Sequence, residues 1–110
     1  MLYYEFNVGN DTYKLRLNTR NLVSLEKTLG CNPLSVFNNG GIPTITNMVA
    51  IFHSSLQQYQ HNISIDKAYE IFDKWLEDGN LATDFIPHIL EIYKVSGLVN
   101  EDTENVDEKN

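Results

Sequence analysis

The chain begins with two segments in which apolar and polar side chains alternate, residues 2–8 and 12–17, on either side of Gly9-Asn10-Asp11. In the second segment the odd positions are apolar, whereas Lys14 and Arg16 face the other way. A period of two is typical of a strand with one buried face, so the pattern predicts a β-hairpin. Because two strands are at best marginally stable alone in water, we expect the hairpin to pack against the helices that follow.

From residue 18 onward, apolar residues recur at intervals of three and four, which is the spacing of amphipathic helices. The strongest break is Asn38-Asn-Gly-Gly-Ile-Pro43, which predicts a loop. Asn18 or Thr19 can cap the first helix, Ser64 caps a later one, and glycines end three of them. We expect helices over 19–29, from Pro33 to Phe37, over 45–59, over 64–78, and from Asn80 or Thr83 to Gly97, with Pro87 in the first turn.

The apolar face of each helix supplies the expected core. Trp75 and Phe72 belong to this face, and at helical spacing they are structural residues rather than a platform on which a ligand stacks. The expected inward positions are Leu22, Leu25, Leu29, Leu34, Val36, Phe37, Ile45, Met48, Val49, Phe52, Leu56, Tyr59, Ile65, Ala68, Tyr69, Phe72, Trp75, Leu76, Ile86, Ile89, Leu90, Tyr93 and Val95.

These elements predict an α+β fold that is mainly helical, with an N-terminal hairpin packed on a bundle of about four to five helices. The chain has 110 residues, a length typical of one domain, and we assign residues 1–97 to a single globular domain. Residues 98–110 are polar and acidic, so we expect a disordered tail that folding does not need. Residues 101–110 carry a net charge of −4 out of −7 for the whole chain.

Charge and hydropathy exclude several classes of partner. The eight basic residues are scattered singly, whereas binding to a phosphate backbone needs several cations together, so we expect no nucleic-acid partner. No apolar run approaches the ~20 residues of a membrane span, and residues 1–6 lack the basic start and apolar middle of a signal peptide. We therefore expect a cytoplasmic protein with no membrane partner.

Residues with catalytic or metal-binding chemistry form no recognisable motif. His53, His61 and His88 do not pair at a spacing of four, which would place two metal ligands on one helix face. The lone Cys31 precludes an intramolecular disulfide, and we expect it to be a small, partly buried residue. The carboxylates Asp66, Glu70, Asp73 and Glu77 repeat as one helix stripe, which is typical of a solvated face. We therefore expect no enzyme, no metal and no cofactor.

Several longer segments occur in a characteristic order after the hairpin. Together they resemble the small tail assembly chaperones of long-tailed phages and prophages of Gram-positive bacteria, over residues 10–97. The segments are Thr19-Arg-Asn-Leu-Val-Ser-Leu-Glu-Lys-Thr-Leu-Gly30, Asn32-Pro-Leu-Ser-Val-Phe37, a glycine loop into Pro43, Tyr59-Gln-His-Asn-Ile-Ser64, Phe72-Asp-Lys-Trp-Leu-Glu-Asp-Gly79 and Glu91-Ile-Tyr-Lys-Val-Ser-Gly97.

The resemblance implies a hairpin on a small helical bundle and a non-enzymatic role. Such chaperones act on the tape measure protein, a long and largely helical client, and help to recruit tail tube proteins around it. They leave before the virion is complete, and a homo-oligomer is possible. An alternative is a structural tail completion or head–tail joining protein of a (pro)phage, and a third is a small regulator or antitoxin-like adaptor.

The residues alone give a hypothesis for the surface that binds the partner. Phe37, Ile42 and Ile45 are surplus apolar residues beside the glycine loop, where a mobile lip could open a groove for a client helix. The chain also ends in Glu108-Lys109-Asn110, which can be encoded by a slippery A-rich heptamer. Proteins resembling this one are commonly made in two forms by programmed frameshift, so a longer form is a further hypothesis.

Overall fold

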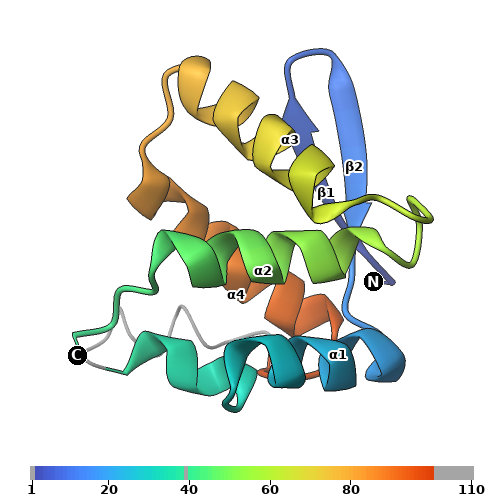
Figure 1. Cartoon of the computed structure of the whole chain (residues 1–110), viewed down its shortest axis with the longest axis vertical. Coiled ribbons are helices and arrows are strands. Elements are labelled where there is room, and N and C mark those ends of the chain that lie inside the picture. The colour runs from blue at the N-terminus through green and yellow to red at the C-terminus, as the bar shows by residue number, and fades with distance from the viewer. Residues whose placement is uncertain (1, 39, 101–110) are drawn as a thin grey trace.

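The computed structural model describes residues 2–38 and 40–100 and confirms the predicted α+β architecture (Figure 1). Residues 101–110 of the predicted tail lie outside the described residues. They include Glu108-Lys109-Asn110, on which the frameshift hypothesis rests. In chain order the elements are β1 (Tyr4–Val8), β2 (Asp11–Leu15), α1 (Thr19–Leu29), the 3₁₀ helix η1 (Pro33–Phe37), α2 (Ile45–Leu56), α3 (Ile65–Glu77), the 3₁₀ helix η2 (Ala82–Asp84) and α4 (Phe85–Val95).

The two strands form the antiparallel hairpin that the alternation predicts, with Val8 opposite Asp11 and Tyr4 opposite Leu15. Gly9 has a φ of 60° and is the first of the two turn residues, as a type II′ turn requires. A two-residue turn makes Val8 and Asp11 a hydrogen-bonded pair, and such pairs alternate along an antiparallel ladder. The side chains of Phe6, Val8 and Leu15 face the helices and are buried.

Helix α2 is the centre of the fold. It contacts α1, α3, α4 and β2, and Figure 1 shows it between α1 and α3 with α4 behind it. Its buried residues lie on every side of the helix, so it lacks the single polar face of a surface helix. Even Ser54 and Ser55 are buried, and the hydroxyl of Ser55 donates a hydrogen bond to the carbonyl of Phe52 at 2.8 Å.

An aromatic cluster joins the hairpin to three helices. The ring of Phe6 on β1 lies 5.4 Å from Phe52 on α2, 5.7 Å from Trp75 on α3 and 5.7 Å from Phe85 on α4. Several of these pairs are edge-to-face, an arrangement that adds roughly 0.5–1.5 kcal/mol per pair to the burial of the rings. Phe72 is a fifth member, at 5.2 Å from Phe85. Trp75 and Phe72 are therefore core residues, as predicted.

Local capping signals place most helix ends where the sequence predicts them. The side chains of Asn18 and Ser64 accept hydrogen bonds from the backbone N–H groups of Asn21 and Lys67. The prediction that the central helix runs to Tyr59 is wrong, because α2 ends at Leu56. The side chain of Gln57 donates to the carbonyl of His53 at 2.9 Å, which is the acceptor that the Gln57 backbone would need to continue the helix.

The buried face of α3 is also rotated relative to the prediction. Ile65 and Tyr69 are exposed, whereas Ile71, which the prediction omitted, is buried with Ala68 and Phe72. At about 100° per residue, Ile65 and Tyr69 lie on one flank of this buried stripe. Phe85 and Ile92 on α4 are likewise buried, although the prediction did not include them.

The end of α4 corrects the predicted domain boundary after Gly97. Gly97 has a φ of 81°, and the N–H of Leu98 donates to the carbonyl of Tyr93 at 2.9 Å. The N–H of Gly97 donates to Lys94 at 3.1 Å, which completes a Schellman motif. Leu98 and Val99 are partly buried and pack against the core, so the folded domain includes them.

Polar side chains connect the two ends of the folded domain. The hydroxyl of Ser96 accepts a hydrogen bond from the N–H of Leu17 at 2.9 Å and donates to the carbonyl of Ile92 at 2.6 Å. The buried hydroxyl of Tyr93 donates to the carbonyl of Pro33 at 2.9 Å. Burial raises the pKa of Tyr93, so this hydroxyl keeps its proton and remains a donor.

The packing of Leu98 and Val99 gives a first testable prediction. A chain that ends at Gly97 should be less stable than a chain that ends at Asn100 by about 1–3 kcal/mol, because it loses apolar burial and the capping bond of Leu98. Urea unfolding followed by the fluorescence of Trp75 measures the difference. Equal unfolding midpoints would show that these two residues contribute nothing to the fold.

A second prediction concerns the aromatic cluster. Trp75 is only 4% exposed, so Trp75→Ala should destabilise the domain by roughly 3–5 kcal/mol, which is a large share of a small domain's stability. The exposed Tyr69 lies on the same helix, and Tyr69→Ala should change the unfolding free energy by about 1 kcal/mol or less. Circular dichroism during thermal unfolding compares the two variants. A Trp75→Ala protein as stable as the Tyr69→Ala protein would contradict the core assignment.

Candidate partner-binding surface

The three residues predicted to bind a partner have different environments. Ile42 is 61% exposed and Ile45 is 49% exposed, on either side of the buried Pro43 and of Thr44, which caps α2. Phe37 is partly buried instead, with its ring 6.2 Å from that of Tyr93 and nearly perpendicular to it. Ile42 and Ile45 are thus available to a partner where the chain enters the central helix, whereas Phe37 packs against the core.

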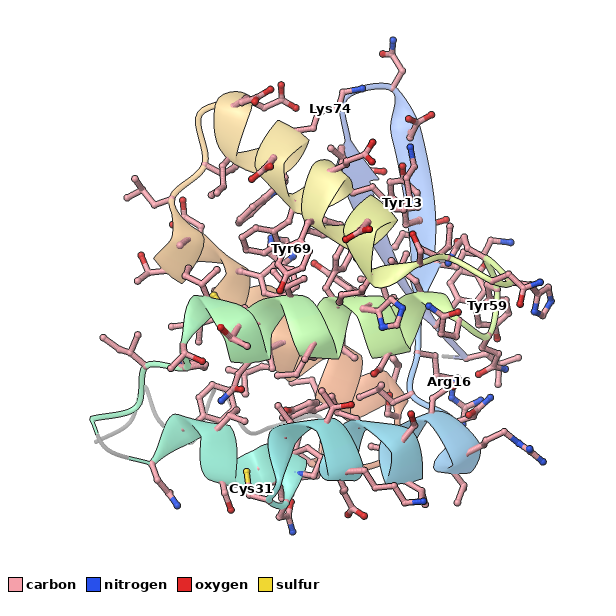
Figure 2. All side chains as sticks on the ribbon, in the orientation of Figure 1. Tyr13, Arg16, Cys31, Tyr59, Tyr69 and Lys74 are labelled. Carbon is pink, nitrogen blue, oxygen red and sulfur yellow. The ribbon has the colours of Figure 1, made fainter. Side chains whose placement is uncertain are left out.

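A second exposed apolar area lies on α3, where the sequence predicted core residues. Ile65 and Tyr69 are one helical turn apart, and Figure 2 shows Tyr69 between α3 and α2 on the face toward the viewer. The acidic stripe of α3 borders this flank, and all four of its carboxylate residues are exposed. The exposure of Ile65 and Tyr69 could have been inferred from helical periodicity, because both lie beside the buried stripe rather than within it.

Residues with catalytic chemistry are dispersed over the structure. His61 is exposed, and the ring of His53 forms a hydrogen bond with the carbonyl of Ile63 at 2.9 Å. Cys31 is exposed, not partly buried as predicted, because it follows Gly30 at the surface end of α1 (Figure 2). Within residues 2–38 and 40–100, no three His, Cys, Asp or Glu side chains lie close enough together to hold a metal ion.

His88 is partly buried and packs against the aromatic cluster. Its ring lies 4.9 Å from Phe6 and 5.8 Å from Trp75, and its Nδ1 forms a 2.7 Å hydrogen bond with the hydroxyl of Tyr4. Burial lowers the pKa of His88, although the nearby carboxylates of Asp84 and Glu91 favour the charged form and oppose part of this shift. The neutral ring is therefore the form that fits the folded state.

This environment predicts a pH dependence of stability. The unfolded chain binds a proton at His88 with the ordinary pKa of about 6.5, whereas the folded chain binds it only at lower pH. Between pH 7.5 and 5.5 the unfolded state therefore holds more protons, and the free energy of unfolding should fall as the solution is acidified.

Urea unfolding across this pH range tests the assignment to His88. His88→Gln should unfold with a smaller pH dependence than the natural chain, and the exposed control His61→Gln should keep the natural dependence. Identical slopes for the natural chain and His88→Gln would show that another group is responsible.

The hairpin, the central helix and the surrounding helices define a small α+β domain with several exposed apolar residues on its surface. Over residues 4–110 the chain matches the family described as a family of unknown function (DUF6096), and it belongs to that family. No curated protein sequence and no solved structure matches the chain. No helix among the described residues is long and apolar enough to cross a membrane.

Proposed function

We propose that this protein is a non-enzymatic tail assembly chaperone of a phage or prophage, which binds the tape measure protein and helps to recruit tail tube subunits. The resemblance of residues 10–97 to that group of chaperones supports the proposal. The proposal is also supported because the segments that carry this resemblance correspond to successive elements of one domain, from α1 to the end of α4. The chaperone would act in the host cytoplasm and would be absent from the mature virion.

The observation that carries the proposal is the exposure of two isoleucines at the start of α2. Isoleucine is usually buried, and a side chain that is 61% exposed, such as Ile42, leaves apolar area in contact with water. A client helix with an apolar stripe would cover Ile42 and Ile45 in the way that amphipathic helices bind hydrophobic grooves. The net charge of −7 would keep the complex soluble and favour basic segments of the client.

Co-expression with tape measure fragments tests the proposal. The natural chain should keep a helical fragment soluble and should co-purify with it. Ile45→Ser should weaken the complex by about tenfold, because it removes apolar area from the contact. The matched control is Val23→Ser on α1, which removes a similarly exposed side chain (46% for Val23 against 49% for Ile45) and should bind normally.

Other outcomes distinguish the alternatives. If no tape measure fragment binds and the protein is found in purified particles, the chain is a structural tail completion or head–tail joining protein, and the chaperone proposal fails. If the client binds but both serine variants bind equally well, the function stands and the assignment of the surface to Ile45 is wrong.

A further inference from the structure

Among the described residues, the rest of the molecule bonds to the outer edge of β2 but leaves the outer edge of β1 uncovered. On β2, the backbone of Lys14 is paired with the side chain of Gln60: the N–H donates to Oε1 and the carbonyl accepts from Nε2, both at 2.8 Å. One residue beyond the strand, the N–H of Arg16 donates to the carbonyl of Ser55 at 2.9 Å. The Gln60 amide acts here as one residue of a third strand, so it covers the outer edge of β2 at Lys14.

The outer edge of β1 has no such cover. Because Val8, Phe6 and Tyr4 are the residues paired with β2, the backbone N–H and C=O groups of Glu5 and Asn7 point away from it. Both residues are exposed, and within the described part of the chain neither backbone forms a hydrogen bond on this outer side. Unpaired backbone groups persist only where water reaches them, so this edge is accessible.

An open hollow of about 570 Å³ continues this edge toward the N-terminus and is lined by Leu2, Tyr3, Tyr4 and Glu5. Successive residues of an extended chain point to opposite faces, so a hollow lined by four in a row lies beside the backbone rather than over one face. Leu2 is 66% exposed at its mouth. The ring of Tyr3 is fixed from the other side, by an edge contact with Tyr59 at 5.3 Å and by the Lys14 ammonium at 4.9 Å.

The chemistry of the edge selects its occupant. Alternating N–H and C=O groups are matched by another extended backbone, which adds a strand, and the hollow suits an apolar side chain of that strand. Glu5 is exposed on the solvent face, where an opposite charge on the added strand is favourable. The chain itself carries −7, so two copies repel each other and a basic segment of another protein is favoured.

We propose that the outer edge of β1, with the hollow beside Leu2–Glu5, binds an extended segment of a different protein by β-strand addition. The bound segment alternates apolar and polar residues, places one apolar side chain in the hollow and carries a Lys or Arg opposite Glu5. This site is separate from Ile42 and Ile45 and does not depend on the proposed chaperone function.

The test uses the full chain and a fluorescent peptide of about seven residues, long enough to cover β1 and the hollow. The peptide has the sequence Val-Thr-Val-Lys-Val-Thr-Val, so its odd positions are apolar and its central residue is lysine. Asn7→Pro removes an outward N–H from β1 and should weaken binding of this peptide about tenfold or more. The matched control is Thr12→Pro, which removes an outward N–H from β2 and should bind like the natural chain.

The two variants are matched because the side chains of Asn7 and Thr12 bond to each other at 2.7 Å, so each substitution loses that contact. A second measurement needs no variant: the peptide should slow hydrogen exchange of the Glu5 and Asn7 amides in the natural chain, as seen by NMR. A peptide N-methylated at alternate residues should not bind.

Three results would overturn the proposal. The first is no binding of the peptide to the natural chain, and the second is binding without protection of the Glu5 and Asn7 amides. The third is a dimer of the natural chain, seen by sedimentation, that Asn7→Pro dissociates, because the occupant would then be a second copy of this chain.

Discussion

The burial of α2 on all sides is the constraint on which the rest of the structure depends. A helix without a polar face is stable in water only if other elements cover most of it. Here the hairpin, α1, α3 and α4 share that task. Each of them needs to bury only one stripe against α2, which leaves their outer faces free.

The same constraint explains why the sheet can consist of only two strands. A hairpin of this size lacks the neighbours that normally satisfy strand edges. The carbonyl of Ser55 at the end of α2 and the side chain of Gln60 just after it supply a substitute. One edge is thereby joined to the central helix, while the other edge faces solvent. The hairpin is thus fixed in position and still able to extend its sheet.

Local chemistry made most of the fold predictable from the sequence. Period-two and period-3.6 patterns, Ser64 as a cap and Gly30 as a stop each act within a few residues, so they can be recognised without the fold. Contacts that depend on distant residues could not be anticipated. Leu98 and Val99, for example, pack against the core although no apolar periodicity marks them in the sequence. Surplus apolarity predicted the candidate surface at Ile42 and Ile45. Which edge of the hairpin is covered could not be predicted, because Gln60 reaches Lys14 of β2 from a distant part of the chain.

The hydrogen bonds between the two ends of the domain have a consequence for synthesis on the ribosome. Tyr4 bonds to His88, Leu17 to Ser96 and Pro33 to Tyr93, so the residues made first have partners that are made last. Loop closure over such separations is slow compared with local helix formation. Until α4 emerges, the apolar face of the nascent hairpin and one side of α2 remain uncovered. The protein therefore completes its core only after translation of the whole folded domain, and a prematurely terminated chain would expose that core to aggregation.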